Sequence, residues 1–127
     1  MPNIFLNLFC DKETVSFPAG QAIFHAGDPG QTMYVVMVGE VEILDGPLVL
    51  EVAGPGSIFG ELALIDDEPR SATVVAKTDC HLVPVDRRRF QYMVQETPLF
   101  ALAVMKVIAD RLRQKNVRTR AQIESGA

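Results

Sequence analysis

The sequence is poor in the side chains that several functional classes require. Its 127 residues include two cysteines, two histidines and no tryptophan. Two thiols are too few for a disulfide framework, and an iron–sulfur cluster needs four thiolates. His25 and His81 lie far apart in the chain, without acidic or thiol partners at ligand spacing, whereas zinc sites show clustered ligands. We therefore expect reduced thiols, a cytoplasmic location and no bound metal.

Long apolar runs are also missing. No stretch of about 18 apolar residues occurs, so the sequence predicts no membrane-spanning helix. The apolar segment at residues 4–9 has no basic region before it, which favours a short docking helix over a secretory signal. With 48% apolar and 22% charged residues, the composition is that of a globular protein. The length predicts a single domain over residues 1–127.

Basic residues are scarce in the first two thirds of the chain. Residues 1–86 carry thirteen acids and three bases, Lys12, Arg70 and Lys77, for a net charge of −10. Nucleic-acid-binding faces need clustered lysine and arginine, so we expect no direct nucleic-acid binding there. Residues 87–127 carry nine bases and three acids. This basic end suits the C-terminal dipole of a solvated helix, and attraction to an acidic partner or to nucleic acid is the alternative.

Short β-type runs separated by turns fill the chain from about residue 14 to residue 86. The runs are rich in β-branched and aromatic residues or alternate apolar with polar residues, and they cover residues 32–38, 41–43, 49–52, 73–75 and 81–85. Clusters of glycine and proline, which favour turns, lie between them. Many short strands without intervening helices predict an antiparallel sandwich or jelly roll.

The pattern becomes helical after residue 85. Asp86 is a candidate N-cap for a helix with Phe90 on its apolar face. A second helix is expected from Pro98, because proline is tolerated in a first turn. This helix is apolar on nearly all sides over residues 99–109, so it needs cover from the barrel or from a second copy of itself. We expect C-terminal helices over about residues 87–122, followed by no helix-turn-helix, so that any output passes through a partner or a change of oligomeric state.

Residues 56–76 combine features that suit a sugar–phosphate ligand. Gly60 precedes a short helix-forming run that begins at Glu61. A glycine permits close approach of a ligand, and the N–H groups at a helix start favour an anion. Arg70 is the only arginine before residue 87, and its planar guanidinium matches phosphate oxygens in pairs. The carboxylate of Glu61 can accept a hydrogen bond from a sugar hydroxyl.

A purely structural interpretation of this segment stays open on these residues alone. Arg70 could form surface salt bridges with the acids at 66–68, worth about 0–1 kcal/mol. Glu61 could be an ordinary first-turn acid that interacts favourably with the helix dipole.

The spacing of the segment resembles that of a known family. Phe-Gly-Glu-Leu-Ala-Leu at 59–64, then four residues, then Pro-Arg-Ser-Ala-Thr at 69–73 is similar to the phosphate-binding cassette of cyclic-nucleotide-binding domains of the Crp/Fnr type. That family includes catabolite activator proteins, the regulatory subunits of cyclic-AMP-dependent kinase and cyclic-nucleotide-gated channels. The likeness extends over roughly residues 14–113.

The resemblance implies both a fold and a set of site residues. The fold would be mainly β, an eight-stranded antiparallel jelly-roll barrel (double-stranded β-helix), with an N-terminal helix, a short helix in the cassette and C-terminal α-helices. Arg70 would bind the exocyclic phosphate oxygens, and Glu61 would bind the ribose 2′-hydroxyl. The remaining implied site residues are Phe59, Gly60, Leu62, Ala63, Ser71 and Ala72 in the cassette, and Ile43, Leu50 and Val52 against the base.

The resulting expectation is a cytoplasmic, non-enzymatic sensor that binds cAMP, with cGMP as the alternative, and signals through its C-terminal helices to a partner or within a homodimer. Ser71 in place of threonine favours cAMP.

A jelly-roll interaction or dimerisation module without a nucleotide is the second hypothesis, supported by the apolar helix over residues 99–109. A metal enzyme of the cupin type would need clustered histidines with a carboxylate, and the sequence has none. Met1 and the polar end at 125–127 suit a complete small protein, while a fragment of a larger regulator or channel stays open.

Overall fold

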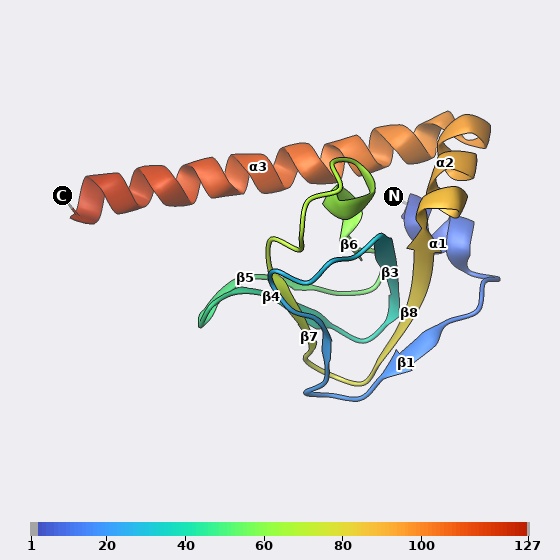
Figure 1. Cartoon of the computed structure of the whole chain (residues 1–127), viewed down its shortest axis with the longest axis horizontal. Coiled ribbons are helices and arrows are strands. Elements are labelled where there is room, and N and C mark those ends of the chain that lie inside the picture. The colour runs from blue at the N-terminus through green and yellow to red at the C-terminus, as the bar shows by residue number, and fades with distance from the viewer. Residues whose placement is uncertain (1–2, 127) are drawn as a thin grey trace. The chain divides into compact units, whose positions relative to one another are not determined.

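The computed structural model describes residues 3–126, with side chains described as far as residue 121. The helices and strands follow one another (Figure 1) as α1 (Ile4–Phe9), β1 (Val15–Phe17), β2 (Ala22–Phe24), β3 (Thr32–Val38), β4 (Val41–Asp45), β5 (Leu48–Ala53), β6 (Ile58–Phe59), the 3₁₀ helix η1 (Glu61–Leu64), β7 (Thr73–Ala76), β8 (Cys80–Asp86), α2 (Arg87–Glu96) and α3 (Pro98–Gly126). The described residues divide into a first unit that ends at Tyr92 and a second that begins at Met93. The boundary falls within α2.

The strands of the described chain form two four-stranded sheets. One has the strand order β1-β8-β3-β6 and the other β2-β7-β4-β5, and the pairings in both are antiparallel. The predicted architecture of two antiparallel layers followed by helices is confirmed. The β-type runs in the sequence correspond to β3, β4, β5, β7 and β8. The other three strands are two or three residues long, which is too short for an alternating pattern to be recognised.

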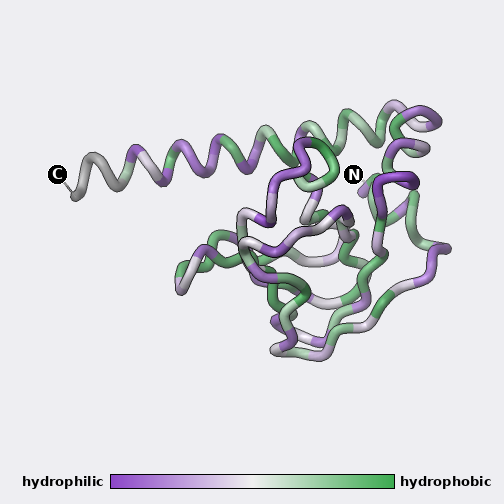
Figure 2. Tube along the Cα trace, in the orientation of Figure 1, coloured by the Kyte–Doolittle hydropathy of each residue, from purple (hydrophilic) through white to green (hydrophobic). Residues whose placement is uncertain are grey.

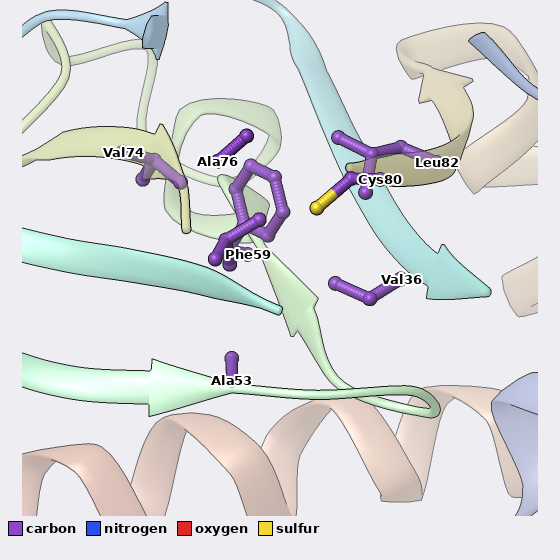
Figure 3. Packing of buried hydrophobic residues seen from close by; sticks show 8 residues of the cluster. Val36, Ala53, Phe59, Val74, Ala76, Cys80 and Leu82 are labelled. Carbon is purple, nitrogen blue, oxygen red and sulfur yellow. The ribbon is translucent and has the colours of Figure 1, made fainter. Parts of the chain in front are cut away.

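The core between the two sheets is built around Phe59, the last residue of β6. Figure 3 shows its ring between Val74 and Ala76 of β7 and Cys80 and Leu82 of β8. Three partly buried aromatic residues, Phe17, Phe24 and Tyr34, extend this cluster, with ring centroids 5.3 to 6.5 Å apart. Because the cassette turn follows Phe59 directly, core packing determines where the cassette starts.

The opposite face of β3 is also buried. Alternation along the strand points Met33 and Val35 away from the other sheet, yet neither side chain is exposed. Helix α1 lies against β3 and buries Phe5 and Phe9. The side chain of Asn3 caps α1 by accepting hydrogen bonds from two backbone N–H groups of its first turn, at 2.9 and 3.1 Å. The predicted N-terminal docking helix is therefore present.

The C-terminal helices begin where the sequence predicts. Asp86 Oδ1 accepts a hydrogen bond from Arg89 N at 2.8 Å, which is the N-cap bond of α2, and α3 begins at Pro98. Figure 2 shows a largely hydrophobic start to α3 and more hydrophilic residues towards its C-terminal part. Its exposed large apolar side chains are Leu99, Leu102, Met105, Leu112 and Val117.

The tight turn between β3 and β4 depends on Gly39. This residue has φ +89°, and a Cβ at this position would lie 2.3 Å from Asp79 O and 2.9 Å from Cys80 Sγ. Gly39→Ala should therefore lower the free energy of unfolding by more than about 2 kcal/mol, because left-handed strain of about 1–2 kcal/mol adds to a clash with backbone. Gly46→Ala is the matched control, since Gly46 also has a positive φ (+56°) but nothing within 4 Å. Urea unfolding measures both losses, and equal losses would contradict this packing.

Candidate functional site

Arg70 is held at the centre of the site by its own backbone. Its N–H donates to the carbonyl oxygen of Asp28 at 2.8 Å, and its own carbonyl oxygen accepts from Gly27 N at 2.8 Å. These two bonds tie the segment that leads into β7 to the turn that follows β2. They set the point from which the Arg70 side chain extends into the molecule.

The guanidinium of Arg70 lies inside the protein. Nη1 donates to Gly60 O at 3.2 Å and Nη2 donates to Thr32 O at 2.8 Å, while Cζ stands 4.0 Å from the centroid of the Phe24 ring. The residue is 8% exposed. Its Nε is buried without a hydrogen-bond partner, alone in this respect among the described side chains. An unpaired buried donor is costly, so this nitrogen marks a place where an acceptor would bind favourably.

The charge of Arg70 is buried, and its surroundings act on it in opposite directions. Burial lowers the pKa of Arg70 from its ordinary value, while nearby Tyr34, Asp28 and Glu61 raise it. Arginine stays protonated under ordinary conditions, so the site carries a lasting positive charge. Both guanidinium hydrogen bonds go to carbonyl oxygens, while the carboxylates of Asp28 and Glu61 lie near enough to act on the charge.

Two glycines allow the guanidinium to reach this position. A Cβ on Gly30 would lie 2.4 to 2.6 Å from Nε, Nη2 and Cζ of Arg70, and a Cβ on Gly60 would lie 2.8 Å from Nη1. Gly60 also has φ +81° at the start of η1, a conformation that glycine adopts without strain. Glycine at both positions is therefore required for the observed placement of Arg70.

The three acids at 66–68 do not form the surface salt bridges that the structural interpretation of Arg70 required. All three are exposed, and Asp67 pairs with Arg87 at the start of α2. Asp67 and Glu68 line an open hollow together with residues 27 and 29–31. The two carboxylates disfavour an anion in that hollow.

The cassette residues named from the sequence differ in burial and in their relation to Arg70. Glu61, the first residue of η1, is 4% exposed and lies near enough to Arg70 to affect its pKa. Phe59 belongs to the core, Ala63 is buried and Leu62 is exposed. Ser71 is exposed and Ala72 half-buried, between Arg70 and β7. The structure thus brings Gly60, Glu61 and Arg70 together in three dimensions, with the other cassette residues adjoining them in the chain.

The three residues predicted to contact a base lie on one sheet but not on one face. Ile43 pairs with Glu51 and packs against the core between the sheets. Val52 pairs with Glu42 on the other face and is 43% exposed, because successive strand residues point in opposite directions. Leu50 falls at a shift in register and is half-buried. Ile43 and Val52 therefore do not meet, and Glu51 stands beside Ile43 instead.

Several residues around Arg70 were missed from the sequence. Phe24, Gly30 and Thr32 lie 38 to 46 positions away in the chain and carry no motif that links them to an arginine. The closely spaced glycines of the turn after β2 were the available signal, and they were interpreted as a turn alone. The position of Glu51 beside Ile43 was also missed, because the bulge between β4 and β5 hides which face each residue occupies.

The described residues include no cluster of metal ligands and no single membrane-spanning helix. No group of three or more His, Cys, Asp or Glu side chains there could hold a metal ion. No single helix in that part is long and apolar enough to cross a membrane. Only α2 and α3 taken together, as a bent pair, have the length and apolar composition that a membrane span needs.

Similarity to known proteins agrees with this geometry. A family model for the cyclic nucleotide-binding domain matches residues 14–97. The chain is 35% identical over 106 residues to the Cyclic AMP receptor protein of Thermus thermophilus, covering 80% of this chain and 49% of that protein. The crystal structure of Thermus thermophilus Catabolite Activator Protein matches with a TM-score of 0.77 and 32% identity, over 86% of this chain and 54% of that one. The regulatory domain of Toxoplasma gondii PKA, crystallised with cAMP, matches with a TM-score of 0.58 and 36% identity, over 63% of this chain and 32% of that one.

The matched range covers most of the first unit and includes the site. It runs from just before β1 to just after α2 and contains both Glu61 and Arg70. The chain spans about half the length of the curated relatives it matches. With a family model covering more than half of its residues, this chain belongs to the cyclic nucleotide-binding domain family.

Proposed function

We propose that this protein is a sensor that binds a cyclic nucleotide, with cAMP preferred to cGMP, and signals through its C-terminal helices. The observation that carries the proposal is the buried guanidinium of Arg70 with its unpaired Nε. A cyclic phosphate supplies both the negative charge and the acceptor oxygens that this group lacks. The Thermus thermophilus Cyclic AMP receptor protein and the Toxoplasma gondii PKA structure with cAMP support the choice of ligand.

Each cassette residue has a role in this proposal. Arg70 binds the exocyclic phosphate oxygens through Nε and an Nη group, since two of its five N–H donors already engage carbonyl oxygens. Glu61 accepts a hydrogen bond from the ribose 2′-hydroxyl. Backbone N–H groups of the remaining cassette residues, and the hydroxyl of Ser71, complete the contacts. The residues that supply these N–H groups are Gly60, Leu62, Ala63 and Ala72.

The inner face of β4 and β5 is the proposed place for the base. Ile43 provides apolar contact there, and Glu51 adds an acceptor beside it. Leu50, which falls at the register shift between β4 and β5, is kept as a further proposed contact. We leave Val52 out of the proposed site, because it lies on the opposite face of the sheet. The strand order of the two sheets supports assignment to the jelly-roll class.

The output proposed for the sensor is a homodimer or protein partner that contacts α3. Leu102, Met105 and Leu112 are more than half exposed, and their spacings of three and seven residues match the seam of a coiled coil. Binding acts by favouring one placement of the C-terminal helices over another. We place this function in the cytoplasm, in one domain that joins a barrel over about residues 14–86 to helices over about 87–122, without catalysis or a metal.

The proposal predicts that Arg70 dominates nucleotide affinity. Arg70→Ala should weaken cAMP binding at least about tenfold, because each hydrogen bond to a charged group contributes about 1.5–3 kcal/mol. Lys77→Ala, which removes another base of the same region, should leave affinity unchanged since Lys77 is exposed. Isothermal titration calorimetry measures the cAMP affinity of both variants and of the parent. Parent-like affinity of Arg70→Ala would refute the assigned role.

A second prediction tests whether the observed placement of Arg70 is the one that binds. Gly30→Ala puts a methyl group within 2.6 Å of the guanidinium, and because it displaces Arg70 without removing it, it should weaken cAMP binding by less than Arg70→Ala does. Gly54→Ala is the control, because a Cβ there meets its nearest atom at 4.0 Å. Calorimetry measures affinity, and thermal unfolding checks that both variants fold. Unchanged affinity in a folded Gly30→Ala protein would mean that another placement of Arg70 binds the ligand.

A nucleotide-independent dimerisation module is the second candidate, and the exposed apolar side chains of α3 favour it. This candidate would be selected if calorimetry detects no binding of cAMP or cGMP and the protein forms a stable dimer.

A homodimer, under either function, predicts self-association through α3. The double variant Leu102→Glu with Met105→Glu should be monomeric, because two carboxylates interrupt the apolar seam. Gln114→Glu, on an exposed position of the same helix, should stay dimeric. Light scattering coupled to gel filtration gives the mass of each, and a monomeric parent would exclude the α3 dimer.

A further inference from the structure

Arg87 connects the cassette to the first helix that follows the sheets. It is the first residue of α2, and its guanidinium reaches back to the far end of η1. Nη1 donates to Leu64 O at 3.2 Å, Nη2 donates to Ala63 O at 3.4 Å, and Nη2 also pairs with the carboxylate of Asp67. A single side chain thus contacts three groups of the cassette, all within the first unit.

The contacts of Arg87 are the ones that the end of a helix requires. Ala63 and Leu64 are the last residues of η1, and the final carbonyl oxygens of a helix have no partners inside it. A cation at a helix C-terminus also interacts favourably with the dipole. Asp67 has φ +58°, an uncommon conformation for a residue with a side chain. Arg87 therefore stabilises both the end of η1 and the turn after it.

Arg70 and Arg87 hold opposite ends of the same short helix. Arg70 contacts Gly60 at the start of η1, and Arg87 contacts its last two carbonyl oxygens. Four residues of 3₁₀ helix span about 8 Å. With Glu61, Ala63 and Leu64 buried, such a short element moves as one piece, so a shift at its start reaches its end.

We propose that Arg87 is a positioning residue that couples occupancy of the cassette to the first turn of α2. The inference rests on the proposed function, because it assumes that a cyclic nucleotide occupies the Arg70 end of η1. Ligand contacts at that end set the position of η1, and Arg87 conveys this position to α2, from which the chain continues into α3. By linkage, the arrangement of α2 also affects nucleotide affinity.

The neighbouring arginines of α2 provide the comparison. Arg89 donates to Pro84 O at 3.4 Å and, through its backbone, to the Asp86 cap at 2.8 Å. These bonds hold α2 to β8 without reaching the cassette. Arg88 is exposed. Arg88→Ala is therefore a matched control for Arg87→Ala, since it removes the same side chain one position away.

Hydrogen exchange of the full chain, followed by mass spectrometry, tests the coupling. In the parent protein, saturating cAMP should slow exchange in residues 61–68 and also in residues 89–96. In Arg87→Ala the cassette should still be protected at saturation, while the response of residues 89–96 is lost. Its affinity should fall between about twofold and thirtyfold, the range found for residues that modulate coupling without touching the ligand. Arg88→Ala should behave as the parent, and Arg87→Lys should recover part of the response.

Two results would overturn this role for Arg87. One is a full response of residues 89–96 to cAMP in folded Arg87→Ala protein, and the other is a parent without any such response. If the parent binds no nucleotide, the proposed function fails instead. Hydrogen exchange measured without ligand still tests whether Arg87 stabilises the cassette. Arg87→Ala should then exchange faster than Arg88→Ala in residues 64–68, and equal rates would overturn the link as well.

Discussion

A guanidinium removed from water and hydrogen-bonded to two carbonyl oxygens is the constraint on which the site depends. Desolvating a charge is costly, and Arg70 meets this cost with two carbonyl acceptors, one aromatic face and two backbone bonds to the turn after β2. One donor, Nε, remains unpaired. The arrangement is the opposite of a surface salt bridge, in which acids would neutralise the charge. The guanidinium, with Asp28 and Glu61 nearby, is the group that binds the phosphate in the proposed function.

The surrounding structure follows from the need to place that group. Phe59 anchors the start of the cassette in the core, and Phe24 offers its ring to the guanidinium from the other sheet. Gly30 and Gly60 are glycines because a Cβ at either position would occupy the space of the guanidinium. Residues from β2, β3 and the cassette thus meet at one point. A change in any of them alters the position of the same charged group.

The two ends of η1 are held by arginines with different surroundings. Arg70 is buried and lies at the start, whereas Arg87 is partly exposed, with 32% of its side chain accessible, and lies at the end. The exposed acids between them include the partner of Arg87, so the acidic loop contributes to the structure of the cassette. In this arrangement the same short helix contacts the proposed ligand site at one end and the start of the C-terminal helices at the other.

The sequence alone was sufficient for strands β3, β4, β5, β7 and β8, the cap at Asp86, the helix start at Pro98 and the choice of Arg70 and Glu61 as candidate site residues, because these features are local or are carried by a contiguous motif. It could not reveal Phe24, Thr32 or Gly30 as neighbours of Arg70, since their proximity arises only when β2, β3 and β7 are brought together. It placed Ile43 and Val52 in one contact surface, and the observed register assigns them to opposite faces. It counted Arg87 within a basic region, and the fold places it against the cassette. Composition and spacing therefore determined which groups the protein has, while strand register and packing decided which of them meet, because pairing between distant segments depends on the whole set of contacts and on no single local pattern.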